Sequence, residues 1–145
     1  MLVRMLPSEI ENKWAIINHA IVNCLPAVVG SDVAAQMRAI NNMKVSLIAG
    51  TLQAWLMYED NKVLAVGITG VAADEIARET SLVIYSLYGY EKITDAQWAE
   101  ALNTIKKFAK ALKCNNICAF TDVDRVREIA ANIGGVLKTF IKWEV

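Results

Sequence analysis

The sequence predicts an α/β fold in which helices cover both faces of a central sheet. Three segments, residues 52–58, 63–71 and 81–88, are rich in β-branched and aromatic residues and are apolar at successive positions. Strands that are apolar on both sides are buried on both sides. Helical patterns occur before and after these strands, so the chain can supply a layer for each face.

The N-terminal region predicts a short strand, Leu2 to Leu6, followed by a helix. Ser8 and Glu11 have the spacing of a capping box, and Pro26 ends the helical pattern. The apolar positions at helical spacing are Ile10, Trp14, Ile17, Ile21 and Leu25. The only histidine, His19, lies off this stripe and outside any nucleophile motif, so we interpret it as a rim residue rather than a catalytic base.

A second helix, a hairpin and a further strand follow. Ser31 is predicted to cap the helix, which extends toward Ala49 before Gly50. Segments 52–58 and 63–71 are separated by Glu-Asp-Asn-Lys, which is turn chemistry, so we expect them to form a hairpin. The polar stretch after this hairpin leads into the strand 81–88.

The clearest helix begins at Thr94, which has the capping-box spacing to Gln97. Its buried stripe is predicted to be Trp98, Leu102, Ile105, Phe108, Ala109 and Leu112. The four lysines on its C-terminal half are Lys106, Lys107, Lys110 and Lys113. We interpret these lysines as a solvated outer face that complements the helix dipole, in preference to a binding patch.

The C-terminal third predicts a strand at 116–120, a helix at 123–133 that ends at Gly134 and Gly135, and a last strand from Val136 to Val145. Along this last segment, mainly apolar residues alternate with Lys138, Phe140, Lys142 and Glu144. The alternation predicts one packed face and one solvated face.

Length and composition fit one domain over residues 1–145 and exclude a disordered chain, since 55% of residues are hydrophobic and 21% charged. The 15 Lys and Arg balance the 15 Asp and Glu, which argues against a nucleic-acid or anionic-membrane surface. Cys24, Cys114 and Cys118 lack zinc-site spacing and are interpreted as buried thiols. No apolar run is long enough for a membrane helix. We expect a soluble protein of a reducing intracellular compartment, with no metal.

Three segments carry a family resemblance. They are the strand 81–88, the helix that ends in Ile-Lys-Lys-Phe-Ala-Lys-Ala-Leu-Lys113, and the segment Cys-Asn-Asn-Ile-Cys-Ala-Phe-Thr-Asp at 114–122. With the order of elements, they make nearly the whole chain similar to the Gcn5-related N-acetyltransferase (GNAT) superfamily. Trp55 and the pair Ile84 and Tyr85 also resemble GNAT-like proteins of tailed bacteriophages. The resemblance implies a mixed, mostly antiparallel sheet.

The chain departs from the family at the phosphate loop. In active members a loop of the form Gln/Arg-x-x-Gly-x-Gly/Ala opens the long helix and holds the pyrophosphate of acetyl-CoA with backbone amides. The resemblance places Ala96 and Trp98 at the glycine positions. Glu91 and Asp95 lie near the positive end of the helix dipole, where each would disfavour a pyrophosphate by about 1 kcal/mol. Lys92 is the only cation in this loop.

Two further departures follow from the resemblance. The family's tyrosine, a general acid for the departing CoA thiolate, falls on Ala130, and the family's asparagine is replaced by Asp122. Active members end in two strands, whereas this chain offers one, Val136 to Val145. We therefore expect the final strand of the fold to be missing, with this edge free to dock a protein partner or a second copy.

These departures predict a GNAT-fold protein with a degenerate acetyl-CoA site that binds no cofactor and serves as a non-catalytic structural or binding subunit of a phage virion or its assembly. The alternative is a divergent N-acetyltransferase that uses acetyl-CoA on an unidentified amine. Its candidate proton-handling residues are Tyr85, Tyr88, Tyr90 and Glu91. Its candidate cofactor-binding residues are Leu87, Gly89, Lys92 and Thr94. The simpler interpretation of the tyrosines is strand packing with the hydroxyl at the rim.

Overall fold

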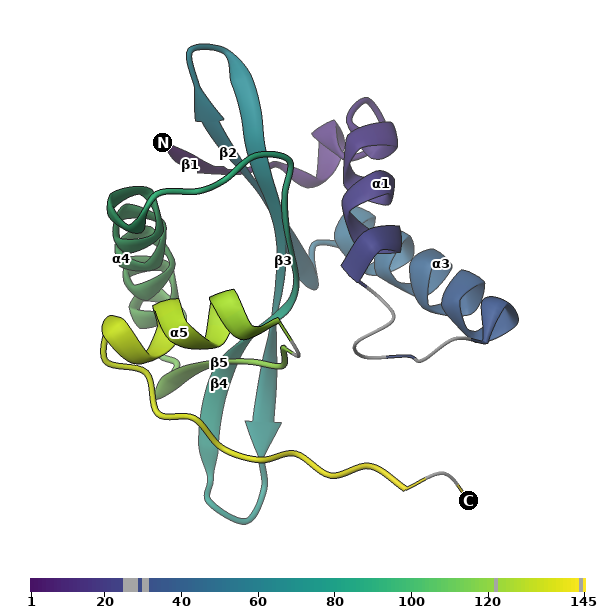
Figure 1. Cartoon of the computed structure of the whole chain (residues 1–145). Coiled ribbons are helices and arrows are strands. Elements are labelled where there is room, and N and C mark those ends of the chain that lie inside the picture. The colour runs from purple at the N-terminus through teal and green to yellow at the C-terminus, as the bar shows by residue number, and fades with distance from the viewer. Residues whose placement is uncertain (25–28, 30–31, 122, 144) are drawn as a thin grey trace.

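The computed structural model of the chain describes residues 1–24, 29, 32–121, 123–143 and 145. The described strands are β1 (Leu2–Arg4), β2 (Leu52–Glu59), β3 (Lys62–Asp74), β4 (Glu79–Gly89) and β5 (Asn116–Ala119). The described helices are the 3-10 helix η1 (Pro7–Glu9) and the α-helices α1 (Trp14–Cys24), α3 (Val33–Ala49), α4 (Asp95–Ala111) and α5 (Asp124–Asn132). The strands form one sheet in the order β1-β2-β3-β4-β5 (Figure 1).

The sheet is mixed and mostly antiparallel, as predicted. Each neighbouring pair is antiparallel except β4 and β5, which run parallel because α4 forms the crossover between them. Helices α1 and α3 lie on one face, and α4 and α5 lie on the other (Figure 1). The predicted fold class is therefore confirmed, including the burial of the central strands between two helical layers.

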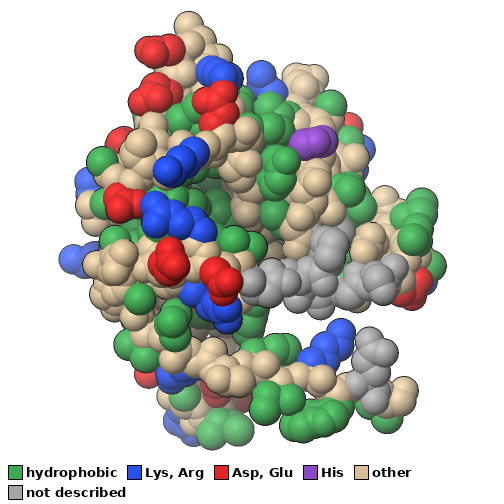
Figure 2. All heavy atoms as spheres, in the orientation of Figure 1, with side chains coloured by type: hydrophobic (Ala, Val, Ile, Leu, Met, Phe, Trp, Pro, Cys, Tyr) green, Lys and Arg blue, Asp and Glu red, His purple; other side chains and the backbone are tan. Residues whose placement is uncertain are grey.

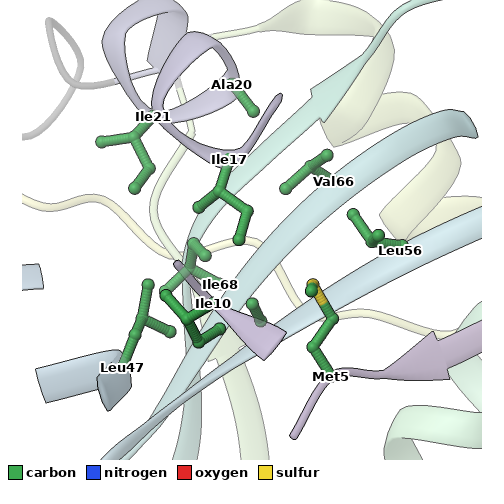
Figure 3. Close-up of a cluster of buried hydrophobic side chains, with 10 residues drawn as sticks. Met5, Ile10, Ile17, Ala20, Ile21, Leu47, Leu56, Val66 and Ile68 are labelled. Carbon is green, nitrogen blue, oxygen red and sulfur yellow. The ribbon is translucent and has the colours of Figure 1, made fainter. Parts of the chain in front are cut away.

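The core beneath α1 and α3 confirms most of the first predicted stripe. Ile17 and Ile21 of α1 are fully buried and project toward the sheet, where Val66 and Ile68 of β3 meet them (Figure 3). Complete burial of one such side chain is worth about 1.5–3 kcal/mol. On the opposite face, the Trp55 ring meets Phe108 of α4 edge-on, with ring centroids 5.1 Å apart.

The hairpin between β2 and β3 forms where its turn chemistry predicted. Asp60 and Asn61 both have positive φ, 49° and 61°, and Glu59 pairs with Lys62 across the turn. Two left-handed residues give a connection whose twist matches that of the strands, and Asp and Asn tolerate this conformation. The turn thereby sets the register between β2 and β3.

The predicted start of the first helix is wrong. The Leu6 amide donates to the Glu9 carboxylate at 2.7 Å, so η1 rather than a capping box of Ser8 and Glu11 begins this region. Glu11 instead forms an ion pair with Lys44 of α3 at 3.3 Å. Pro7 fixes a φ suited to the first turn of a helix, which favours the start of η1 at Pro7.

The second helix ends as predicted, with Gly50 at a φ of 80° after Ala49. At its start the Asp32 carboxylate accepts from the Ala34 amide at 3.0 Å. The predicted cap Ser31 and the predicted stop Pro26 lie outside the described residues. Among the helices that are described, none is long and apolar enough to span a bilayer.

The predicted C-terminal strand does not form. Residues 136–143 and 145 have no strand structure, and their large apolar side chains are exposed, with Trp143 at 77%. Phe140 contacts Phe120, the residue after β5, with centroids 5.2 Å apart. Alternating side chains make a strand only when a neighbouring backbone pairs with it, and within the described chain this segment has no such neighbour.

Candidate functional site

Strand β4 separates from β5 halfway along its length. Residues 81–84 of β4 pair with residues 116–119 of β5, and the pairing stops at Ile84. On the other side of β4, Ser86 lies opposite Ile68 while Ile84 lies opposite Thr69, so Tyr85 is an extra residue in a β-bulge. A bulge bends its strand and increases the twist. The second half of β4 therefore diverges from β5.

A cavity of about 620 Å³ occupies this divergence. Six consecutive residues of β4, Ile84 to Gly89, line it. The helical walls include Trp98 and Ile105 of α4, Ile129 and Ala130 of α5, and Asn23 and Cys24 of α1. Because α1 lies across the sheet from α4 and α5, the cavity passes from one layer to the other. Figure 2 shows a hollow on this face of the molecule, with hydrophobic side chains inside and charged side chains at the rim.

One residue that borders the cavity, Ser86, has a buried and unpaired hydroxyl. Ser86 is only 5% exposed. Among the described residues, its Oγ is the one buried side-chain oxygen or nitrogen that has no hydrogen-bond partner. The buried hydroxyl of Thr69 differs, because it accepts from Trp55 Nε1 at 2.8 Å and donates to Gln53 Oε1 at 3.0 Å. An unsatisfied buried hydroxyl costs about 1–3 kcal/mol. Ser86 lies opposite Ile68 of the α1-side core, so this hydroxyl is sealed inside the protein.

A thiol also reaches the cavity wall. Cys24, the last residue of α1, donates through its Sγ to the Leu87 carbonyl at 3.2 Å, across 63 positions of sequence. All three cysteines are free and half-buried rather than fully buried as predicted, and Cys24 is the one that lines the cavity. The cavity wall therefore includes one free thiol.

An aromatic cluster adjoins the cavity on the α1 side. His19 stacks on Tyr90 with centroids 5.4 Å apart and meets Tyr88 edge-on at 5.5 Å. The Tyr90 hydroxyl donates to the Ile16 carbonyl at 2.9 Å. Burial, and secondarily the charge of ionised Tyr88, raise the pKa of Tyr90 above its ordinary value. His19 is exposed, as predicted, and packs on the cluster.

The N-terminus of α4 is occupied by the protein's own side chains. Thr94 Oγ1 accepts from the Gln97 amide at 3.2 Å, and Gln97 Oε1 accepts from the Thr94 amide at 2.9 Å, so the predicted capping box is confirmed. Arg125 of α5 pairs with Asp95 at 2.8 Å. Glu91 forms an ion pair with Lys62 at the hairpin. Both carboxylates in this loop are therefore matched by cations from other elements.

The structure separates the predicted site residues into two groups. Tyr85, Leu87, Tyr88 and Gly89 all line the cavity, as do Trp98 and Ala130. Outside its lining lie Tyr90, Glu91, Lys92 and Thr94. The roles predicted for these residues stay predictions, and Asp122 lies outside the described residues. Within the described ranges, no group of three or more His, Cys, Asp or Glu side chains could hold a metal ion.

Two residues of the cavity were not identified from the sequence. Ser86 carried a signal, because it is a polar residue in an otherwise apolar run. Cys24 carried none, because its contact with Leu87 depends on how α1 packs across β4. Only the tertiary structure brings these two residues to one cavity.

The order of the strands, the single parallel pair and the helices on both faces define the fold of the GNAT acetyltransferases. No protein-family model matches the chain, and no curated protein matches its sequence. Solved structures match over the whole chain. A structure described as a probable acetyltransferase is 10% identical with a TM-score of 0.70, and the match covers 100% of this chain and 96% of that one.

Two further structures are described together with a ligand. A predicted acetyltransferase from Clostridium acetobutylicum, solved with acetyl-CoA, is 13% identical with a TM-score of 0.69, covering 100% of this chain and 94% of that one. An aminoglycoside N-acetyltransferase in complex with CoA is 9% identical with a TM-score of 0.66, covering 100% and 93%. At these identities the similarity establishes the fold alone, and the phage resemblance stays a prediction.

Proposed function

We propose that this chain binds an acyl thioester of the acetyl-CoA class in the cavity along β4 and works as a binding subunit rather than as an efficient N-acetyltransferase. The observation that carries the proposal is the cavity itself, which is lined by six consecutive residues of β4, Ile84 to Gly89. A strand with a free edge offers backbone donors and acceptors to an extended ligand. This proposal revises the expectation that the chain binds no cofactor.

The ligand class is supported by the solved structures that contain acetyl-CoA or CoA and share this fold. Apolar walls from α4 and α5 suit the pantetheine and acyl parts of such a ligand, since ligand sites are mainly apolar with a few placed polar groups. The polar partners of the ligand would be the backbone donors and acceptors of β4 beyond Ile84, where the pairing with β5 stops.

The nucleotide end of the ligand is expected to contribute little affinity. The Gln97 amide in the first turn of α4 is already capped by Thr94, and Asp95 adds a carboxylate at the positive end of the helix dipole. Arg125 neutralises that carboxylate and is itself engaged by it. A pyrophosphate would have to displace this pair, so the acyl and pantetheine arm is the part that the site favours.

The binding role is supported by Ala130. This methyl group lines the cavity where the family resemblance would place a tyrosine, and it has no proton for a departing thiolate. A phage virion or assembly component is the setting that the phage resemblance suggests for such a subunit. The exposed apolar side chains of residues 136–143 support a protein partner or a second copy of the chain as its contact.

The second candidate is a divergent N-acetyltransferase, and it is favoured by the passage of the cavity through the sheet. An amine that entered from the α1 side would meet a thioester bound between α4 and α5. Tyr85 and Tyr88 line this passage and would be the groups that move the proton. Release of free CoA thiol with a panel of amines would favour this candidate over the binding role.

Calorimetric titration with acetyl-CoA tests the proposal. We expect micromolar binding by the native chain, a loss of about tenfold or more in Ala130→Phe because the larger ring fills the cavity, and native affinity in Ala131→Phe. Ala131 is the matched control, because it is the next residue of α5 and is exposed. No heat at millimolar acetyl-CoA would overturn the proposal.

A further inference from the structure

The cavity extends across the sheet well beyond β4. Its lining includes Leu2 of β1, Trp55 and Met57 of β2, and Ala65 and Gly67 of β3. Because neighbouring strands lie about 4.8 Å apart, the distance from β4 to β2 is roughly 10 Å. A thioester carbonyl held at the free edge of β4 would therefore fill only one end of this space.

The lining of the cavity is uncharged over the part of the chain that the structure describes. None of these lining residues is Asp, Glu, Lys, Arg or His, and most are aliphatic or aromatic. The polar side chains among them come from Asn23, Thr69, Ser86 and Thr121. The Thr69 hydroxyl is already paired with Trp55 and Gln53, and the Ser86 hydroxyl is sealed inside the protein. A charged ligand group would lose its hydration here without a partner, whereas an alkyl chain would gain from burial.

Gly67 keeps the middle of this space open. It lies opposite Trp55 of β2 and Leu87 of β4 in the sheet register, and it lines the cavity. Its φ is outside the left-handed region, and a Cβ atom at this position would come no closer than 3.7 Å to Leu87 Cδ1 and the Ser86 carbonyl oxygen. Neither the backbone conformation nor crowding therefore requires glycine here. A glycine inside a strand often marks a close approach by a ligand.

We propose that the cavity takes a medium-length alkyl chain, hexanoyl to decanoyl, which runs from β4 over Gly67 toward β2. The thioester that this site prefers is then a medium-chain acyl thioester. This inference rests on the proposed function and deepens it by naming the acyl group. An acetyl group has no methylene and would stay at β4, whereas an octanoyl chain reaches toward Met57. Ala101 of α4 packs in one cluster with Met57 and lines the far end of this path.

A series of acyl chain lengths tests the inference. Each methylene that passes from water into an apolar lining is worth up to about fourfold in affinity. The calorimetric series is acetyl-, butanoyl-, hexanoyl-, octanoyl-, decanoyl- and dodecanoyl-CoA. We expect the affinity to rise from acetyl to octanoyl and to stop rising between decanoyl and dodecanoyl, where the chain exceeds the cavity. The matching S-acyl-N-acetylcysteamines, which lack the nucleotide, should give the same order.

Ala101→Leu fills the far end of the path. We expect octanoyl-CoA to bind about tenfold or more weakly and acetyl-CoA to keep its native affinity, because only the longer chain reaches position 101. The retained binding of acetyl-CoA also reports that the chain is folded. Ala111→Leu is the matched control, because Ala111 lies on the same helix, is exposed and is outside the cavity lining. It should leave both affinities unchanged.

Gly67→Ala narrows the middle of the path by one methyl group, for which the structure has room. It should weaken the binding of octanoyl-CoA more than that of acetyl-CoA. The combined variant Leu137→Ser, Ile141→Ser and Trp143→Ser should keep the full dependence on chain length, because these exposed side chains lie outside the cavity. Loss of that dependence in the combined variant would mean adsorption to the C-terminal segment and would overturn the inference.

The outcomes separate this inference from the proposed function. Equal affinities for acetyl-CoA and octanoyl-CoA overturn the inference and leave the proposed function standing. No heat with any thioester of the series overturns both. Native binding of octanoyl-CoA by Ala101→Leu overturns the path toward β2. Octanoate that binds as tightly as S-octanoyl-N-acetylcysteamine would make the free acid the ligand and would overturn the assignment to a thioester.

Discussion

Tyr90 links the second half of β4 to α1 through a single hydroxyl. That hydroxyl donates to the Ile16 carbonyl, and the ring stacks on His19. Burial disfavours the ionised phenol, and an ionised Tyr88 nearby disfavours it further, so both effects raise the pKa of Tyr90. The hydroxyl proton of Tyr90 therefore takes part in the contact between α1 and the sheet.

The raised pKa of Tyr90 predicts a loss of stability in alkali. The folded chain keeps this proton at a pH where the unfolded chain, with an ordinary pKa of about 10, has lost it. The contribution is therefore complete below about pH 10 and falls as the pH rises through the raised pKa. Urea unfolding from about pH 8 to pH 11 should show this fall, and it should be smaller in Tyr90→Phe. An unchanged pH slope in that variant would contradict the assignment.

Thr69 gives a second residue-level prediction, because it satisfies two polar groups inside the core. Thr69→Val keeps the shape but leaves Trp55 Nε1 and Gln53 Oε1 without their partner. We expect the free energy of unfolding to fall by about 1–3 kcal/mol in urea titrations. Thr80→Val at the start of β4 is the control and should stay within about 0.5 kcal/mol. A neutral Thr69→Val would mean that this network adds nothing to stability.

At the scale of elements, the N-terminus of α4 decides which part of a thioester ligand the site favours. Asp95 lies in the first turn of α4 and pairs with Arg125 of α5, so the charge that would oppose a pyrophosphate also bridges two helices. Both side chains are largely exposed, so the pair contributes little to stability. Its effect is expected on binding.

Asp95→Asn should therefore strengthen binding of full-length acetyl-CoA by roughly twofold to fivefold, since one charge near a helix N-terminus is worth about 0.3–1 kcal/mol. Binding of the short thioester S-acetyl-N-acetylcysteamine should not change. Glu11→Gln is the matched control, because it removes another ion-paired carboxylate, on the α3 side, and should alter neither affinity. Equal gains for both ligands would contradict an effect on the nucleotide end.

The sequence predicted some helices and strands correctly and others wrongly. The hairpin and α4 formed where expected, because a turn of Asp60 and Asn61 and a capping box at Thr94 are local signals. The start at η1 was misplaced, because Glu9 rather than Glu11 caps it. The segment from Val136 alternates like a strand and is not one, because a strand depends on a partner backbone that alternation does not supply.

At the scale of the whole molecule, the exposed C-terminal segment is the feature that predicts assembly. Its large exposed apolar side chains are Val136, Leu137, Phe140, Ile141 and Trp143. A formal net charge of zero gives no long-range repulsion between copies. Because exposed apolar surface of this kind marks interaction sites, we expect the purified chain to self-associate.

Light scattering at several concentrations tests this expectation. The combined variant Leu137→Ser, Ile141→Ser and Trp143→Ser should shift the chain toward the monomer, because it removes apolar area from the contact. A matched control is Val33→Ser with Met37→Ser and Val45→Ser, three apolar residues exposed on α3. This control should keep the native distribution. A strictly monomeric native chain that recovers no partner by pull-down would count against assembly.

The sequence by itself determined the helical and extended segments, their two-sided burial and the resemblance that carried the fold, because periodicity, caps and turns are local properties of the chain. It also located Tyr85, Leu87 and Tyr88 on the strand that borders the cavity. Only the tertiary structure decided that β4 leaves β5 after Ile84, that the Ser86 hydroxyl is left unpaired, and that Cys24 reaches Leu87. Those facts depend on contacts between distant segments, which no local pattern encodes.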